Sequence, residues 1–273
     1  MNSIQKALLR QLKSFHKLCE ENNIVYFVVG GTQLGAIRHN GFIPWDDDID
    51  VAVPRSDYEK LATSGNSFCD EKHKIKCQQT EPGCPISFIR YELLNSTCIE
   101  EYRDNTGFSS GIYIDIFPID GIPHNKILQI FRIIEVRILK MIFYCCVTSN
   151  YKKRNVFKRG IIIFCKKHLS REKIENKIHS ILKGYQINTN QNVANLIGSN
   201  KYYEMKREIM PYEIYFPQKK YKFEDTYIYG VNKPNKYLEM LYGKNYMNMP
   251  PKEERKGKHN ITLFKENNSN LFN

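Results

Sequence analysis

The sequence lacks the cysteine spacings that build a structural zinc site. Its eight cysteines include no C-x-x-C pair, and none is combined with histidines at the spacing of zinc ligands. We therefore interpret them as reduced thiols of a cytoplasmic protein. The first residues, MNSIQKALLRQLKSFHKLCEEN, also lack an uninterrupted apolar run. This argues against a signal peptide or an N-terminal anchor, so we expect the active site to face the cytoplasm.

Acidic residues are in the minority. The chain has 29 Asp plus Glu against 41 Lys plus Arg, a net charge of +12, which predicts an anionic partner: phosphorylated small molecules, an acidic membrane surface or nucleic acid. The basic residues cluster beside isoleucines rather than among aromatic side chains that stack on bases, and no DNA- or RNA-binding motif is present. A nucleic-acid-binding protein is thus the least favoured class, and we expect no nucleic-acid partner.

Residues 1–120 have the pattern of an α+β domain. Apolar residues recur at helical spacing over residues 3–21, which predicts an amphipathic first helix. Short runs of β-branched and aromatic or alternating residues predict strands at 24–29, 48–54, 86–93, 97–102 and 111–117. This order of elements predicts a mixed sheet with flanking helices.

Residues 121–200 differ from the first part of the chain because they combine apolar and basic residues. On a helical wheel the segment 127–147 has an apolar stripe, with Gln129, Arg132 and Lys140 opposite it. The segment 151–168 has seven Lys or Arg and no acid. One interpretation is a helical region on an anionic membrane, where each basic residue contributes about 1 kcal/mol. The other is a buried helical hairpin, and periodicity alone does not distinguish the two.

The last part of the chain divides into a segment at 201–262 and a tail at 263–273. A helix is predicted to end near Tyr242, with Gly243 as its C-cap. We expect 201–262 to complete the active site and 263–273 to be a frayed tail.

Acidic residues are concentrated in one short stretch, GGTQLGAIRHNGFIPWDDDIDVAVP, at residues 30–54. Asp48 and Asp50 are two residues apart on a predicted strand, so they point to the same side and can converge on one divalent cation. Mg²⁺ prefers such oxygen ligands. The preceding Gly30-Gly31 lets the backbone approach a phosphate closely. We therefore predict a phosphate-plus-metal site.

Other polar residues are candidates for the same site. Asp115 lies in an otherwise apolar strand, so it either binds the metal or acts as a base, or else is paired with an arginine. Arg38 and His39 are placed to meet a diphosphate, unless they are a surface pair. Arg255 likewise either meets the diphosphate or is an ordinary surface residue. Asp46 and Asp47 stay ambiguous between supporting the site and shaping the entry to the strand.

At this point the motifs resemble a known family. The stretch GGTQLGAIRHNGFIPWDDDIDVAVPRSDYEKL closely resembles the signature of the LicD family, which includes bacterial phosphocholine transferases and is related to fukutin and the fukutin-related protein. GIYIDIFPIDGIP and YLEMLYGKNYMNMPPKEER, further along the chain, are similar to other parts of that pattern.

The resemblance implies a nucleotidyltransferase-like fold and a substituted-phosphate transferase. A CDP-activated or CMP-activated donor, such as CDP-choline, would pass its phosphate-linked group to a sugar hydroxyl of a surface or lipid-linked glycan and release CMP. Asp48, Asp50 and Asp115 would bind Mg²⁺, with Mn²⁺ as an alternative. The residues implied to bind the donor phosphates are Gly30, Gly31, Thr32, Arg38, His39 and Arg255.

Two questions stay open from the sequence. A nucleotidyltransferase that moves NMP from an NTP to a small molecule or an RNA end would use the same fold. The transferred group is also open among phosphocholine, phosphoethanolamine, aminoethylphosphonate and a polyol phosphate, because a choline site calls for an aromatic cage and the only tryptophan, Trp45, lies inside the acidic motif. We expect a cytoplasmic protein held peripherally at the inner face of the membrane.

Overall fold

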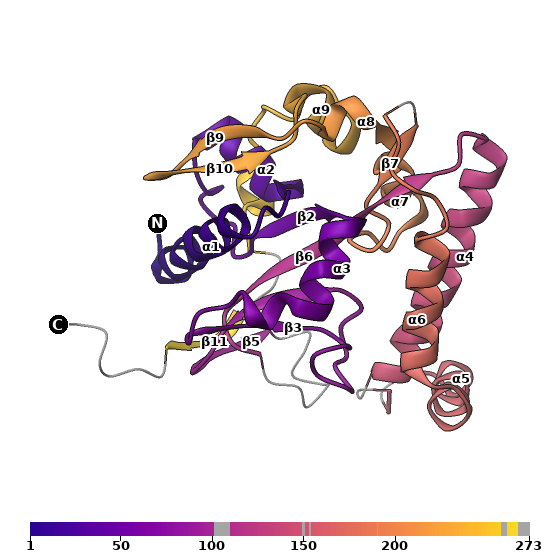
Figure 1. Ribbon diagram of the computed structural model, residues 1–273. Helices are drawn as coiled ribbons and strands as arrows, with labels where there is room; N and C mark the ends of the chain where they lie inside the picture. The colour runs from indigo at the N-terminus through magenta and orange to yellow at the C-terminus, as the bar shows by residue number, and fades with distance from the viewer. Residues whose placement is uncertain (101–109, 149–150, 153, 190, 258–260, 267–273) are drawn as a thin grey trace.

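The computed structural model describes residues 1–100, 110–148, 151–152, 154–189, 191–257 and 261–266 (Figure 1). The helices are α1 (Ser3–Glu21), α2 (Gly30–His39), α3 (Arg55–Ser64), α4 (Lys126–Val147), α5 (Val156–His168), α6 (Arg171–Leu182), α7 (Tyr202–Arg207), α8 (Tyr212–Tyr215) and α9 (Pro234–Tyr242), with short 3-10 helices η1 (Gly65–Ser67) and η2 (Lys252–Glu254). The strands are β1 (Phe27–Val28), β2 (Asp50–Pro54), β3 (His73–Lys76), β4 (Ile89–Leu93), β5 (Ser96–Glu100), β6 (Tyr113–Ile122), β7 (Asn192–Ala194), β8 (Met210–Pro211), β9 (Lys219–Phe223), β10 (Thr226–Gly230) and β11 (Ile261–Glu266).

The central feature is a mixed sheet with the strand order β3-β4-β6-β2-β1-β10-β9. Strand β7 pairs with β6 and β8 at one side of this path, while β5 and β11 form a separate pair. Strands β2 and β6 are parallel, as are β1 and β10, whereas β1 and β2 are antiparallel. The prediction of a mixed sheet with flanking helices is therefore confirmed.

Helices cover both faces of the sheet because alternate strand residues point to opposite sides. Val51 and Val53 belong to a buried cluster that includes apolar residues of α1 and α3. Ala52, between them, belongs to a second cluster with residues of α2, α8 and α9. A third cluster joins the end of β6 and β7 to α4, α6 and α7. The alternation expected for this strand is thus present in the structure.

Several predicted element boundaries shift. The strand predicted at 48–54 begins at Asp50, so Asp48 precedes it, and the strand predicted at 24–29 is only Phe27–Val28. Residues 101–102 of the strand predicted at 97–102 lie outside the described residues, as do residues 267–273 of the predicted tail. The prediction of a frayed tail is wrong for residues 263–266, because they belong to β11, which pairs with β5. The helix predicted to end near Tyr242 does end there, with Gly243 as its C-cap. Strands β9 and β10 join the sheet beside β1, which the sequence did not reveal.

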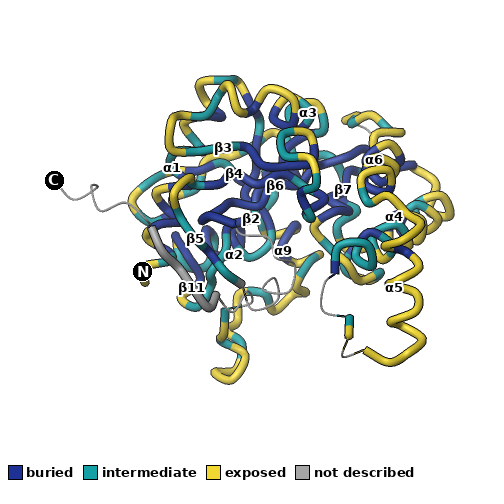
Figure 2. Tube along the Cα trace, turned by 90° about the horizontal axis from the view of Figure 1, so that it is seen from below, coloured by how far each residue is buried: buried dark blue, intermediate teal, exposed yellow. Residues whose placement is uncertain are grey.

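The apolar stripe predicted on residues 127–147 lies on the surface of α4, not in the core. Its exposed members are Ile127, Ile130, Phe131, Ile134, Ile138 and Met141, which are 40–65% exposed. Figure 2 shows most of α5 exposed as well, and α5 carries Val156 and Phe157 at 88% and 78% exposure. The second interpretation, in which this stripe is buried in a helical hairpin, is therefore wrong. Among the described helices, none has both the length and the apolar composition needed to cross a bilayer.

Candidate active site

The site forms at one edge of the sheet, where β1 ends and β2 begins. Because these strands are antiparallel, their two termini meet at the same edge, and α2 starts there directly after β1. The N–H of Val29 donates to the carbonyl of Asp50 at 3.1 Å. The N–H of Asp50 donates to the hydroxyl of buried Thr32 at 3.0 Å. These bonds fix the first acid of β2 against the first turn of α2.

Two glycines let this turn approach the acids. Gly30 has a φ of +55°, a conformation that costs an L-residue with a side chain about 1–2 kcal/mol. A Cβ on Gly31 would lie 3.0 Å from an oxygen of Asp46. The N-cap residue Val29 has no side-chain acceptor, so the helix dipole and the first N–H groups make this end of α2 attractive to an anion.

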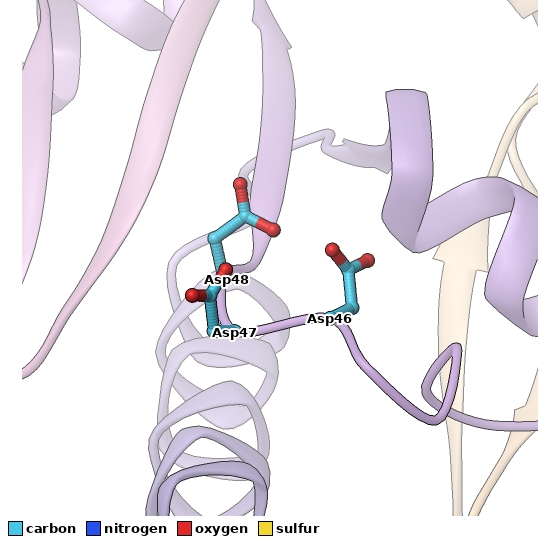
Figure 3. Close-up of side chains that lie close together, drawn as sticks. All are labelled: Asp46, Asp47 and Asp48. Atoms are coloured by element: carbon cyan, nitrogen blue, oxygen red, sulfur yellow. The ribbon is translucent and has the colours of Figure 1, made fainter. Parts of the chain in front are cut away.

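Three carboxylates meet in the loop that leads into β2 (Figure 3). One oxygen each of Asp46, Asp47 and Asp48 lie within 4.8 Å of one another. Buried Gln5 of α1 holds the loop, because its amide donates to the carbonyls of Ile43 and Asp46 at 3.1 and 3.0 Å. Like charges this close favour a cation between them, and carboxylate oxygens fit Mg²⁺. Asp46 and Asp47, which the sequence left ambiguous, thus lie with Asp48.

The predicted metal set also included Asp50 and Asp115. These two residues are register partners on the parallel strands β2 and β6. Asp115 is 6% exposed and forms an ion pair with fully buried Arg90, whose Nε lies 2.9 Å from its Oδ1. Arg90 also donates to the hydroxyl of Ser110 at 2.7 Å. Asp115 therefore has the arginine partner that a buried acid requires, and its role in the reaction stays a prediction.

The predicted phosphate-binding side chains contact the C-terminal segment. Arg38 donates to the carbonyls of Tyr246 and Asn248 at 3.1 and 3.2 Å, and its Nε lies 3.0 Å from Nε2 of His39. Burial, with the charge of Arg38 as a second cause, lowers the pKa of His39. Arg38 thus attaches the segment after α9 to the end of α2.

Arg255 makes a similar link further along the same segment. Its Nε donates to the carbonyl of Pro250 at 2.9 Å, and its guanidinium lies 5.6 Å from the centre of the Trp45 ring. Gly257 lies so close to Asp47 that a Cβ there would overlap the carboxylate. The structure therefore brings residues 250–257 against the acidic loop, two hundred residues away in sequence.

A pocket of about 420 Å³ opens beside this edge. On one side it is lined by Gly30, Gly31 and Asp50. The other side comes from the segment 195–208 and from α9 and includes Asn195, Tyr203, Glu204, Arg207, Glu208, Tyr237 and Tyr242. The hydroxyl of Tyr237 accepts from the N–H of Gly30 at 3.0 Å and joins the two sides. The sequence predicts that 201–262 completes the site, and the motif that begins at Tyr237 includes Tyr242. None of Asn195, Tyr203, Glu204, Arg207 and Glu208 was predicted from the sequence, because no motif marks them.

Lys140 of α4 shapes one part of the pocket wall. Its ammonium donates to the carbonyls of Leu196, Ile197 and Ser199 at 3.3, 2.6 and 2.6 Å. Burial lowers its pKa to about 7. The three carbonyl acceptors have the opposite effect, because they match the three N–H groups of the charged form and stabilise it. The side of α4 opposite the predicted apolar stripe therefore faces inward: buried Ile133, Val136 and Phe143 pack there, and Lys140 positions the loop between β7 and α7.

Comparison with known proteins bears on this site. A family model described as the LicD/FKTN/FKRP nucleotidyltransferase domain matches residues 23–127, which contain the acidic loop. The chain is also 30% identical over 259 residues to the lipopolysaccharide cholinephosphotransferase LicD of Haemophilus influenzae, and the alignment covers 93% of this chain and 94% of that protein. The chain belongs to the LicD family. The resemblance inferred from the motifs, and with it a phosphotransferase type of enzyme, is confirmed.

Two uncharacterised proteins match shorter parts of this LicD-family chain. One, from Rickettsia prowazekii, is 31% identical over 120 residues, which are 44% of this chain and 41% of that protein. The other, from Rickettsia typhi, is 45% identical over 51 residues, 19% of this chain and 16% of that protein. The LicD family model ends at residue 127, so the pocket wall formed by 195–208 and α9 lies beyond the segment it matches.

Proposed function

We propose that this LicD-family protein transfers phosphocholine, or a closely related phosphate-linked group, from a CDP-activated donor to a sugar hydroxyl of a lipid-linked glycan such as lipopolysaccharide. CMP is the leaving product. The observation that carries the proposal is the acidic loop beside the N-terminus of α2, whose Gly30 and Gly31 line a pocket. The near full-length match to a lipopolysaccharide cholinephosphotransferase supports the reaction class.

The acidic loop supports the proposal of a magnesium site. Asp46, Asp47 and Asp48 would hold Mg²⁺ or Mn²⁺ through carboxylate oxygens, with Asp50 next to them on β2. When bound, the ion would neutralise the donor diphosphate and so favour departure of CMP. Charge balance also supports a bound cation, because four carboxylates without one would repel a diphosphate.

The protein's own groups would orient the donor and the acceptor. The first N–H groups of α2 and its dipole would bind phosphate oxygens. Asp115, on the strand beside Asp50, would accept the proton of the attacking hydroxyl, while Arg38 and Arg255 add positive charge to the donor side and hold the C-terminal segment in place. Such a site accelerates transfer mainly by positioning and electrostatic stabilisation.

A panel of donors tests the reaction. The protein is incubated with Mg²⁺, a lipid-linked glycan as acceptor, and CDP-choline, CDP-ethanolamine, CMP-aminoethylphosphonate or CDP-ribitol, and CMP release is measured. We expect release from one donor and its loss in Asp48→Asn. Asp225→Asn is the matched control, because this exposed acid pairs with Lys13 on the surface. Pyrophosphate release from an NTP in place of CMP release would instead identify a nucleotidyltransferase.

We propose further that α4 and α5 hold the enzyme on an anionic membrane, where a lipid-linked acceptor would lie. The two helices lie together at one side of the molecule (Figure 1). Their exposed apolar side chains include Phe131, Met141, Phe157 and Phe164. The exposed basic residues of α5 are Lys158, Arg159, Lys166 and Lys167. Apolar insertion and attraction to anionic lipid act together on such a surface.

Vesicle binding tests the membrane contact. We expect co-sedimentation with vesicles that contain phosphatidylglycerol, weaker binding to pure phosphatidylcholine, and loss of binding in the Phe131→Asp/Phe157→Asp double variant. Tyr227→Asp is the control, since this exposed aromatic residue lies on β10. Equal binding of the double variant and the control would refute the contact.

A further inference from the structure

Aromatic side chains from β6, α9 and the segment 195–208 line the pocket. The hydroxyl of Tyr242 lies 3.8 Å from where a Cβ on Gly30 would be, so this ring borders the start of α2. The Tyr242 ring is 43% exposed and lines the pocket, together with Phe117 and buried Tyr237. The Tyr203 ring also lines it, but Lys201 and Arg207 already lie 5.5 and 5.6 Å from that ring's centre. An aromatic face attracts a cation through its negative electrostatic potential. Tyr242 is therefore the ring best placed to contact a cationic ligand.

The lining of the pocket has more acidic than basic side chains. Among the described residues that line the pocket, three are acidic, Asp50, Glu204 and Glu208, and one is basic, Arg207. Glu204 has a cation already, because Lys201 lies 3.2 Å from it. Glu208 Oε2 is shielded from solvent and has no hydrogen-bond partner within the described part of the chain.

The surroundings of Glu208 make a cation favourable there. Burial raises its pKa to about 8; the hydroxyl of buried Tyr215 beside it opposes the shift, and the charge of Glu204 adds to it. Glu208 and Tyr242 line the same pocket. Burial raises the pKa of Tyr242, and the charges of Glu208 and of Asp50, Asp46 and Asp48 add to this shift. A positively charged ligand between Glu208 and Tyr242 would stabilise the carboxylate form of Glu208.

The position of the pocket fits the substituent of the transferred phosphate. Gly30, Gly31 and Asp50 line its near side, so a phosphate bound at the N-terminus of α2 would direct its substituent toward Glu208 and Tyr242. A trimethylammonium group donates no hydrogen bond, and it is recognised by aromatic faces and nearby carboxylates. A polyol would instead require several hydrogen-bond partners.

We propose that Glu208 and Tyr242 form the subsite for the cationic substituent of the transferred group, and that this subsite selects an alkylated ammonium such as choline over a neutral polyol. This inference rests on the proposed function, because it takes the phosphate to lie at the N-terminus of α2. Glu208 supplies the charge and Tyr242 supplies the aromatic face.

The test compares CDP-choline with CDP-glycerol, which share the nucleotide and the diphosphate and differ only in the substituent. Binding is measured by calorimetry with Mg²⁺ and without acceptor. We expect CDP-choline to bind at least 10-fold more tightly than CDP-glycerol. Glu208→Gln and Tyr242→Leu should each lower the affinity for CDP-choline at least 10-fold and change the affinity for CDP-glycerol less than 3-fold. Glu239→Gln, an equal charge change at an exposed position of α9, should leave both affinities unchanged.

Each outcome decides one of the two ideas. Equal affinity for both donors, or an equal loss of affinity for both in Glu208→Gln, would refute the proposed subsite even if CDP-choline is turned over. If neither nucleotide binds, choline alone is titrated in a thermal-shift assay against potassium chloride of equal ionic strength. A choline-dependent shift that is lost in both variants would support the subsite while the proposed reaction fails, and no shift would refute the subsite. The unfolding temperature of each variant without ligand shows whether it is folded.

Discussion

Gly35 in α2 offers a quantitative test of how the acidic loop is positioned. After α2 the chain reverses at Asn40, whose φ is +53°, and returns against Gly35. A Cβ on Gly35 would lie 2.5 Å from the carbonyl oxygen of Gly41 and 3.3 Å from the nitrogen of Ile43. Both are backbone atoms, so the loop that leads to Asp46 would have to move.

The two effects of Gly35→Ala oppose each other. Alanine improves helix propensity by about 1 kcal/mol, whereas a steric overlap of this kind costs about 1–3 kcal/mol. Because the overlap is with backbone, we expect a steric cost near the upper end of this range. The free energy of unfolding should therefore fall by about 2 kcal/mol in total. For a chain of this size that lowers the unfolding temperature by about 4–8 °C. The displaced loop should also weaken the bonds from Gln5 and reduce CMP release.

Gly160 is the matched control for this substitution. It also lies inside a helix, α5, but a Cβ there would meet no atom within 4 Å. Gly160→Ala should therefore raise stability by about 0.5–1 kcal/mol, as propensity alone predicts. Thermal unfolding followed by circular dichroism measures both variants. An unfolding temperature that rises equally in Gly35→Ala and Gly160→Ala would refute the steric argument.

Three further predictions concern buried polar groups. Arg55→Met should lower the free energy of unfolding by about 3–5 kcal/mol, because it removes the bidentate partner, at 2.6 and 2.7 Å, of Asp120, which is 1% exposed. Urea unfolding measures this loss, and Arg55→Met/Asp120→Leu should restore much of it. Burial and, less strongly, Arg55 lower the pKa of His179 to about 4 from 6.5. The folded protein therefore binds fewer protons than the unfolded chain below pH 6.5, so stability should fall by about 3 kcal/mol as the pH drops to 4, and His179→Gln should reduce this loss in urea titrations. Lys140→Met leaves three carbonyls without their donor, so it should lower the unfolding temperature and raise the KM for the donor; an unchanged KM would contradict a positioning role.

The parts of the structure that local sequence determines were predicted from the sequence. Alternation around Asp50 placed Val51 and Val53 on the core side, as observed. Gly243 marked the end of α9 because it takes a positive φ of 89°. The dense aspartates and the preceding glycines located the acidic loop, since their spacing is set by the chain itself.

Features set by long-range packing were not predicted. The periodicity of residues 127–147 correctly gave two sides of α4, but not which side faces the protein. In the structure Lys140 turns inward to meet the loop at 196–199, and Phe131 turns outward. Tyr242 lies beside Gly30 because β1 and β10 are parallel and end at the same edge of the sheet, and Glu208 reaches the same pocket from the segment between α7 and β8.

The most direct test of the central claim follows the two phosphates of the donor separately. CDP-choline labelled either at the phosphate next to choline or at the phosphate next to cytidine is incubated with the enzyme, Mg²⁺ and a lipid-linked glycan, and the label in the glycan is counted. The account predicts that only the phosphate next to choline enters the glycan, together with choline, and that Asp48→Asn abolishes the transfer. Label from the cytidine side in the glycan, or transfer that persists in Asp48→Asn, would contradict it.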